Sequence, residues 1–418
     1  MNTYLVGGYI RDLLLKIKSK DKDYLVVGAT EEQLISKGFL KVGNGFPVFI
    51  HPETKNEYAL ARKEVKKDQG YKGFEFQTGS DITLEEDLLR RDITINAIAQ
   101  DENGNYHDPY NGIQDLKNKI IKHVSPAFSE DPLRVLRVAR FAAKLHHLGF
   151  KIAPETIELI REICRTDEIN HLTPERVWME TEKALETKNP EVFFQTLKDI
   201  DGLEKILPEI DNLFGVPQPE KWHPEIDTGI HTMLCLKQIT KLSDQASTRF
   251  AVLCHDVGKA VTPKELWPKH HNHDRLGLPI IKNMCAKYKI PNKHKEIAML
   301  VCEFHQLIHK AKELKAETII KILNKANQKN NPERFDEILL ACIADSKGRT
   351  GFETTEHEGS KYIKQVIKGF SKINTAAIIN EHKHGKSINT AINNEKIAII
   401  NEIKNKNQLS DEIDLDKE

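Results

Sequence analysis

The chain has 418 residues, of which 39% are hydrophobic and 30% are charged, a composition that suits a folded globular protein and excludes an intrinsically disordered one. Lysine plus arginine and aspartate plus glutamate each number 62, so the net charge points neither toward nor away from a polyanionic partner. Any affinity for nucleic acid must come from local basic patches. The length allows about two to four domains.

The cysteines and the N-terminus bear on the compartment. The six cysteines are scattered without a C-x-x-C pair, which argues against a zinc ribbon or a disulfide framework and fits a reducing cytosol. The N-terminal residues lack a basic region and a small-residue cleavage site, and no run approaches the ~18 apolar residues of a membrane span. We therefore expect a cytoplasmic protein without a membrane partner, as a monomer or a homodimer.

The texture of the sequence changes along the chain. The first ~120 residues mix short β-like runs with turns, whereas helical periodicity dominates from about residue 131 onward. A loop rich in Pro and Trp at 216–229 precedes a histidine-rich helical stretch. We expect an α+β protein divided into an α/β head at 1–125, a helical neck and body at 126–222, a helical histidine-rich domain at 223–350, and a helical, partly disordered tail at 351–418.

The first segment of the head carries a diglycine. Residues 3–6 predict a strand, Gly7 and Gly8 follow it, and the next helix carries Arg11. Glycines at a strand–helix junction let the backbone approach a phosphate closely, the start of a helix offers free N–H groups to an anion, and Arg11 adds a charge-assisted contact. By itself this pattern is more often a tight turn with a surface arginine.

Two aspartates follow at the start of the next predicted strand. Asp21 and Asp23 are two residues apart, so on an extended strand their side chains point to the same face. Paired carboxylates can hold Mg²⁺ against a triphosphate. A lone D-x-D is usually a solvated turn, but its position just after the diglycine and Arg11 favours a metal site.

A basic helix is predicted from about residue 131. We expect Asp131 at its N-cap and Pro132 in its first turn. Asp131 and Arg134 are then neighbours on one face and together present an acceptor and a forked donor, enough to read the edge of a nucleotide base. Arg137 and Arg140 repeat the spacing and are candidates for phosphate binding. The plain alternative is a capping aspartate with an i,i+3 ion pair on a solvated face.

These segments together resemble the ordered motifs of class II tRNA nucleotidyltransferases, and the similarity extends to about residue 370. The motifs are Gly7-Gly8-x-x-Arg11-Asp12, Asp21-x-Asp23, Arg90-Arg91-Asp92-x-Thr94-x-Asn96, Glu130-Asp131-x-x-Arg134 and Thr173-Pro174-Glu175-Arg176. The resemblance implies a polymerase-β-like head followed by an all-helical neck and body. It also implies that the chain adds and repairs the 3′-terminal CCA of tRNA with CTP and ATP, without a nucleic-acid template.

The resemblance assigns roles to individual residues. Asp21 and Asp23 would be Mg²⁺ ligands, and Asp131 and Arg134 would form a protein template that selects CTP or ATP. The residues implied to contact the incoming nucleotide are Gly8, Arg11, Arg91, Arg137 and Arg140. A third carboxylate is usual in such sites, and Glu57 and Glu64 are equal candidates. The basic stretch 62–74 reads equally well as a mobile loop over the site and as an ordinary solvated loop.

A second set of residues lies in the histidine-rich stretch. His255 and Asp256 end an apolar helical run, and they can converge on a metal in a helical bundle with His231 upstream and Asp345 downstream. Either His273 or His271 is a further partner. The alternative is a histidine cluster on the surface with no function.

The His255-Asp256 set resembles that of HD-domain phosphohydrolases, which some of the class II transferases carry in this position. The resemblance implies 2′,3′-cyclic phosphodiesterase, 2′-nucleotidase and phosphatase activities. A divalent metal would lower the pKa of a bound water that attacks a phosphate ester. Histidine and aspartate ligands admit Ni²⁺ or Mg²⁺, which we expect, and also Mn²⁺ or iron.

Two other functions compete with CCA addition. A poly(A) polymerase shares the class II head but uses ATP alone, often has a long basic C-terminal extension and lacks an HD domain. Here the chain ends in the acidic sequence DEIDLDKE, and the histidine set is present. A non-catalytic RNA-binding protein on an inactive transferase fold would have no need for the charged pair Asp21 and Asp23.

Overall fold

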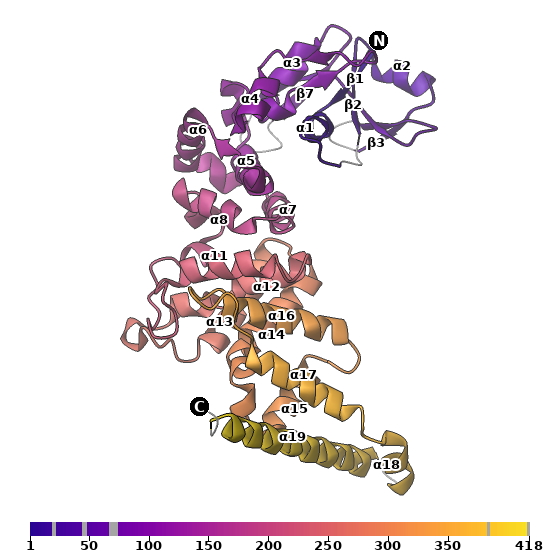
Figure 1. Cartoon of the computed structure of the whole chain (residues 1–418). Helices are drawn as coiled ribbons and strands as arrows, with labels where there is room; N and C mark the ends of the chain where they lie inside the picture. The colour runs from indigo at the N-terminus through magenta and orange to yellow at the C-terminus, as the bar shows by residue number, and fades with distance from the viewer. Residues whose placement is uncertain (19–21, 44–47, 67–73, 383–384, 416–418) are drawn as a thin grey trace. The chain divides into compact units, whose positions relative to one another are not determined.

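The structure is a computed structural model that describes residues 1–18, 22–43, 48–66, 74–382 and 385–415 (Figure 1). The chain divides into two compact units, Met1–Pro208 and Glu209–Glu418. The strands lie in the first unit and the second is helical, which confirms the predicted α+β class. The finer division into four parts remains a prediction.

The first unit contains a mixed sheet with the strand order β3-β4-β5-β2-β1-β8-β9 in the described residues. These strands are β1 (Asn2–Val6), β2 (Asp23–Val27), β3 (Leu40–Val42), β4 (Val48–Ile50), β5 (Glu57–Leu60), β8 (Ala99–Gln100) and β9 (Tyr106–His107). The β-like runs of the sequence therefore form strands side by side. A further short pair, β10 (Ile120–Ile121) and β11 (Lys151–Ile152), is parallel.

Strand β2 divides the core of the head, because successive side chains on a strand point to opposite faces. Leu25 packs in one buried cluster with Val6 and Leu88, and Val26 packs in another with Phe49. Helix α3 (Leu84–Leu89) contributes to the first cluster and α2 (Glu31–Ser36) to the second. The head also contains the helices α1 (Gly8–Leu14) and α4 (Gly112–Asn118).

Part of the basic stretch 62–74, which was expected to be a loop, belongs to a two-stranded sheet. Strands β6 (Arg62–Lys66) and β7 (Phe74–Thr78) pair antiparallel, with Arg62 opposite Thr78. Residues 67–73 lie outside the described residues. Strand β6 has the sequence RKEVK, in which Val65 is the one apolar residue. The high charge of this segment therefore obscured the strand pattern.

The helices that complete the first unit begin where helical periodicity was predicted. They are α5 (Leu133–Leu145), α6 (Pro154–Arg165), α7 (Pro174–Leu185), α8 (Pro190–Asp199) and α9 (Leu203–Ile206). Thr173 is the N-cap residue of α7 and Pro174 follows at its first position, as predicted. Helix α5 packs against α7 and α8 and buries most of its apolar residues, so its arginines are held in fixed positions.

The second unit is a bundle of helices, several of them in mutual contact (Figure 1). The helices are α11 (Thr228–Ile239), α12 (Ala246–Cys254), α13 (His273–Lys287), α14 (Asn292–His309), α15 (Ala316–Lys325), α16 (Pro332–Lys347), α17 (Glu358–Phe370), α18 (Thr375–Glu381) and α19 (Gly385–Leu415). Helices α11, α12, α14 and α16 pack on one another, and most of the histidines lie in or beside them.

Two general expectations can be compared with the fold. All six cysteines are free and buried, which agrees with the absence of a C-x-x-C pair in the sequence. Among the residues that the structure describes, no helix combines the length and the apolar character that a membrane crossing requires.

Candidate functional sites: a cationic cavity in the head and a histidine–aspartate centre in the helical unit

A cavity of about 710 Å³ opens in the first unit, and its lining contains many of the residues singled out from the sequence. They include Gly8, Arg11, Asp23, Glu57, Arg91, Asp131, Arg134, Arg137 and Arg140. Segments that are more than a hundred residues apart in the chain therefore share one space. Asp21 lies outside the described residues.

The diglycine forms the junction between β1 and α1. Gly7 has φ +72°, a conformation that side-chain-bearing residues rarely adopt, and a Cβ there would lie 3.1 Å from Nη1 of Arg91. Arg11 is 3% exposed. Its Nη1 donates to Oδ1 of Asn96 at 2.7 Å, and its Nε donates to Oδ1 of Asp12 at 2.8 Å. The arginine is thus fixed by its neighbours at the wall of the cavity.

Asp23 and Glu57 lie level with each other at one edge of the sheet. Strands β2 and β5 are parallel, and their register pairs Asp23 with Glu57. Both residues line the cavity. The arrangement gives a reason to favour Glu57 as a third carboxylate, although the choice between it and Glu64 remains a prediction, because the side chain of Glu64 lies outside the described part.

Two arginines of α5, Arg137 and Arg140, are held by buried carboxylates. Arg137 donates from Nε to Oδ2 of Asp92 at 2.8 Å, and Arg140 is paired with Glu180, which is fully buried. Burial opposes ionisation of Asp92, but Arg137 and hydrogen bonds from neighbouring groups hold its pKa well below the ordinary range. The attraction of Asp92 raises the pKa of Arg137. The cavity wall therefore carries positive charge in fixed positions.

The start of α5 differs from the prediction in two details. Pro132, not Asp131, is the N-cap residue, and Oδ1 of Asp131 accepts from the backbone N–H of Leu133 at 3.0 Å. Oδ2 of Asp131 accepts from Arg176 at 3.0 Å, a partner distant in the chain that helical spacing does not reveal. The short 3-10 segment Pro126–Glu130 just before Asp131 shifts the start of the helix by one residue.

The alternative interpretation of this helix start, an ion pair on a solvated face, required Arg134 to be exposed. The structure buries it instead. It is 7% exposed and lines the cavity. Its Nη1 donates to the carbonyl oxygen of Ala127 at 2.9 Å, and its Nη2 donates to that of Arg90 at 2.6 Å. Two backbone carbonyls thus fix the plane of the guanidinium group.

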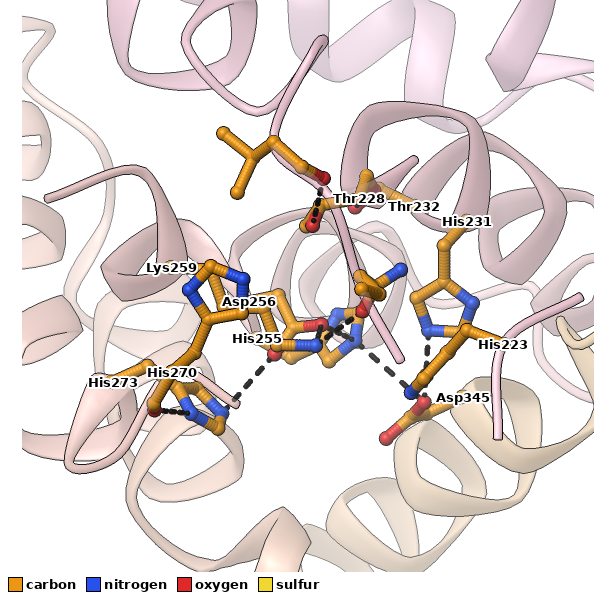
Figure 2. Close-up of polar contacts among 12 residues, drawn as sticks. His223, Thr228, His231, Thr232, His255, Asp256, Lys259, His270, His273 and Asp345 are labelled. Carbon is orange, nitrogen blue, oxygen red and sulfur yellow. Dashed lines mark hydrogen bonds and ion pairs between the residues drawn. The ribbon is translucent and has the colours of Figure 1, made fainter. Parts of the chain in front are cut away.

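In the second unit, four of the predicted residues converge (Figure 2). His231 comes from α11, His255 is the C-cap residue of α12, Asp256 follows it, and Asp345 comes from α16. Nε2 of His231 is 3.1 Å from Oδ1 of Asp345, and Nε2 of His255 is 3.7 Å from the same oxygen and 3.2 Å from Oδ2 of Asp256. All four side chains are buried.

The outer ring nitrogens of the two histidines are oriented by other groups. Nδ1 of His255 lies 2.7 Å from the carbonyl oxygen of Val252 and must donate to it. Nδ1 of His231 lies 2.9 Å from Oε1 of Glu225. Their Nε2 atoms are thereby turned toward the carboxylates, as in histidines that bind metals. Nε2 of His255 is buried and has no hydrogen-bond partner among the described residues, so this donor set fits a metal ion.

The charges of this centre are strongly coupled. Burial opposes protonation of His255, but Asp256 and Asp345 raise its pKa to about 9. Despite their burial, the pKa values of Asp256 and Asp345 are held well below the ordinary value by the histidines and, for Asp256, by Lys259. The two buried carboxylates are stable only with positive charge beside them. A divalent cation would supply such charge.

Both units of the chain are similar to known protein families. Family models match residues 3–122 (Poly A polymerase head domain), 149–214 (Probable RNA and SrmB- binding site of polymerase A) and 228–347 (HD domain). A Multifunctional CCA protein from Psychromonas ingrahamii is 52% identical over 409 residues, which cover 98% of this chain and 100% of that protein. The chain belongs to the multifunctional CCA protein family.

Further relatives agree. A Multifunctional CCA protein from Shewanella frigidimarina is 52% identical over 404 residues, covering 97% of this chain and 98% of that protein. A solved structure of a CCA-adding enzyme in an apo form has 20% identity and a TM-score of 0.65, with 96% of this chain and 88% of that chain covered. The Thermotoga maritima CCA-adding enzyme, complexed with tRNA_CCA, has 19% identity and a TM-score of 0.63, with 96% and 90% covered.

Membership in the multifunctional CCA protein family confirms the resemblance inferred from the motifs. The polymerase-β-like head, the helical body and the HD domain are all present. The chain is an enzyme of the nucleotidyltransferase class that also carries an HD domain, the fold of metal-dependent phosphohydrolases.

Around the HD centre of this family member, the structure adds residues that the sequence analysis did not assign. Of the two histidines left open, His273 reaches Asp256, with Nε2 3.3 Å from Oδ1, whereas His271 is exposed. Nζ of Lys259 lies 2.6 Å from Oδ2 of Asp256, and Nε2 of His309 lies 2.5 Å from Oδ2 of Asp345. Lys259 is three residues after Asp256, a spacing that could have indicated the contact.

Replacing Asp92 tests the role of buried carboxylates in the head. Asp92→Asn removes the closest ionic partner of Arg137, which keeps a longer pair with Glu180 at 3.8 Å. We therefore expect a loss of about 1.5–3 kcal/mol in the free energy of unfolding at pH 7. Because the pKa of Asp92 is depressed in the folded state, its contribution is complete above about pH 3.9 and is lost as the pH falls below that value. The difference between wild type and variant should therefore shrink on acidification, as measured by urea unfolding.

The control is Glu158→Gln, which removes the partner of Arg161 from a pair exposed on the glutamate side. Exposed pairs contribute little, so this variant should unfold like the wild type. A difference between Asp92→Asn and wild type that stayed constant from pH 7 to pH 3 would contradict the ionic role of Asp92.

Proposed function

We propose that the first unit adds C, C and A to the 3′ end of tRNA from CTP and ATP, without a nucleic-acid template. The observation that carries the proposal is the cavity that unites Asp23 with the arginines of α5. Its size of about 710 Å³ lies within the range of small-ligand sites, roughly 300–1,000 Å³. The two relatives are named Multifunctional CCA protein, and these names support CCA as the product.

The residues divide into two roles. Asp23, with Asp21 and Glu57 or Glu64, would hold Mg²⁺, which supplies activation of the attacking hydroxyl and neutralisation of the leaving pyrophosphate. A second group would bind the triphosphate by charge-assisted hydrogen bonds, and it consists of Arg11, Arg91, Arg137 and Arg140, with Gly8 allowing close approach. Buried carboxylates hold most of these arginines in place before the nucleotide arrives, so little ordering is needed on binding.

Selection between CTP and ATP would take place at the start of α5. Asp131 is paired with Arg176, and Arg134 is fixed by the carbonyls of Ala127 and Arg90. These contacts hold an acceptor and a donor in set directions at the cavity wall. A base edge that matches both would be bound, and one that matches only one would leave a buried polar group unpaired.

We propose in addition that the HD domain hydrolyses phosphate esters at RNA 3′ ends, as 2′,3′-cyclic phosphodiesterase, 2′-nucleotidase and phosphatase. The buried convergence of His231, His255, Asp256 and Asp345 supports this second function. These residues would hold a divalent ion, Ni²⁺ or Mg²⁺, which supplies a nucleophile by lowering the pKa of water. Lys259, beside Asp256, is placed to attract the anionic substrate.

The order of addition distinguishes CCA synthesis from poly(A) synthesis. We expect a tRNA that lacks its last three nucleotides to gain two residues with CTP alone, none with ATP alone and three with both, followed by a stop. Radiolabelled products resolved on a sequencing gel give the count. Extension beyond three residues with ATP alone would assign the chain to poly(A) polymerase activity.

The two sites should be separable by substitution. Asp21→Ala or Asp23→Ala should abolish CMP and AMP incorporation and retain hydrolysis of 2′,3′-cyclic AMP, because the two sites lie in different units. His255→Ala or Asp256→Ala should have the opposite effect. Both activities are measured on the same preparation after a thermal melt has shown that each variant is folded. Loss of both activities in one folded variant would contradict this division.

Arg134 should control the choice of nucleotide. Substitution to Ala removes one donor set, and because a bidentate contact to a base contributes about 1–3 kcal/mol of discrimination, the ratio of kcat/KM for CTP and ATP should change by roughly 5- to 150-fold. Arg161→Ala, in a residue outside the cavity lining, is the control and should leave the ratio unchanged. An equal fall for both nucleotides would mean that Arg134 positions the site without selecting the base.

A further inference from the structure

Three arginines of the cavity wall in the head share one aromatic ring. The guanidinium carbon of Arg140 lies 4.3 Å from the centroid of the Phe141 ring, and those of Arg11 and Arg137 lie at 5.2 Å and 5.7 Å. Each distance is within the ~6 Å over which a cation is attracted to the face of an aromatic ring. Phe141 itself lines the cavity. The ring therefore contacts three of the four arginines assigned above to the triphosphate.

The ring connects two separate helices of the head. Phe141 and Arg137 are one helical turn apart on α5, so their side chains are neighbours on one face, whereas Arg11 belongs to α1. Phe141 is 4% exposed and Arg11 is 3% exposed. A cation–π contact is strongest where the cation has lost its water, because solvent no longer competes with the ring. Burial therefore makes Phe141 an effective partner for these charges.

The three guanidinium groups are like charges held close together, so they need partners. Burial lowers the pKa of Arg11, and the positive charge of Arg140 lowers it further. Each group has a buried carboxylate as one partner, and the pairs are Arg11 with Asp12, Arg137 with Asp92 and Arg140 with Glu180.

The ring is a partner of another kind. Additional carboxylates at this wall would hold the arginines more firmly, but their negative charge would repel a triphosphate. An aromatic ring attracts guanidinium groups through the negative face of its quadrupole and carries no net charge. Phe141 can therefore hold the arginines without cancelling the positive charge that attracts the nucleotide.

We propose that Phe141 is a positioning residue, which holds Arg11, Arg137 and Arg140 in place for the triphosphate by cation–π contacts. The inference rests on the proposed nucleotide site in the head. Because CTP and ATP carry the same triphosphate, the ring should affect the binding of both nucleotides equally. In this respect it differs from Arg134, whose proposed contact is with the base.

The competing explanation is that Phe141 only fills space in the core. An aliphatic substitution cannot distinguish the two explanations, since it changes the shape of the core as well as the charge distribution of the ring. Fluorine atoms on the ring withdraw electron density from its face and weaken its attraction for cations, while they change its volume little. A role in packing alone thus predicts no graded response to fluorination.

The test replaces Phe141 in the full-length protein with monofluoro-, trifluoro- and pentafluorophenylalanine in turn. The probe is inorganic tripolyphosphate, which has no base, and the measurement is its inhibition constant against CMP incorporation into tRNA that lacks its 3′ CCA. We expect this constant to rise stepwise with fluorination and to reach about 5- to 30-fold with the pentafluoro ring. The KM values for CTP and ATP should rise together, with their ratio unchanged.

The matched control is the same series at Phe49, which is fully buried in the second core cluster and is outside the cavity lining. A thermal melt shows that each protein is folded, and the control series should leave the inhibition constant unchanged. A flat response at Phe141, an equal response at Phe49, or a changed ratio of the two KM values would overturn the role of the ring. Failure of tripolyphosphate to inhibit the unsubstituted protein would overturn the proposed triphosphate site instead.

Discussion

Both sites depend on the cost of burying charge, which forces every ionised group to have a partner. In the head, buried carboxylates at the cavity wall hold arginines in place: Asp92 holds Arg137, and fully buried Glu180 holds Arg140. In the HD domain the signs are reversed, because carboxylates in the centre are surrounded by histidines and Lys259. In each case, the groups that face the ligand are held in place by ionic partners of opposite charge.

The charge at the centre of each site is positive in the head and negative in the HD domain, and this difference accounts for the different ligands of the two units. A cavity lined by paired arginines retains positive charge toward its opening and is suited to a triphosphate. A centre with two buried carboxylates, Asp256 and Asp345, requires positive charge beside them and is suited to cations. Histidines whose Nδ1 atoms donate to carbonyls or to Glu225 cannot turn their Nε2 atoms away, so the ligand set is formed before any ion is bound.

The sequence predicted most of this arrangement where local periodicity determines position. The strands around Gly7, the helix at Thr173 and the convergence of His231, His255, Asp256 and Asp345 all followed from spacing and motif order. What it did not reveal depends on contacts between distant segments. The partner of Asp131 is Arg176, and the residue level with Asp23 is Glu57, because strand register and helix packing bring them together. Spacing along one helix cannot indicate either contact.

The six buried cysteines have a consequence for how the protein would respond to its surroundings. Burial raises the pKa of the Cys164 thiol to about 12 and that of Cys285 to about 11, and since the thiolate is the reactive form, the native protein should resist alkylation and oxidation. Labelling would then require local opening. Because Cys164 belongs to the first unit and Cys285 to the second, the rates at which the two thiols react would report separately on the opening of each unit.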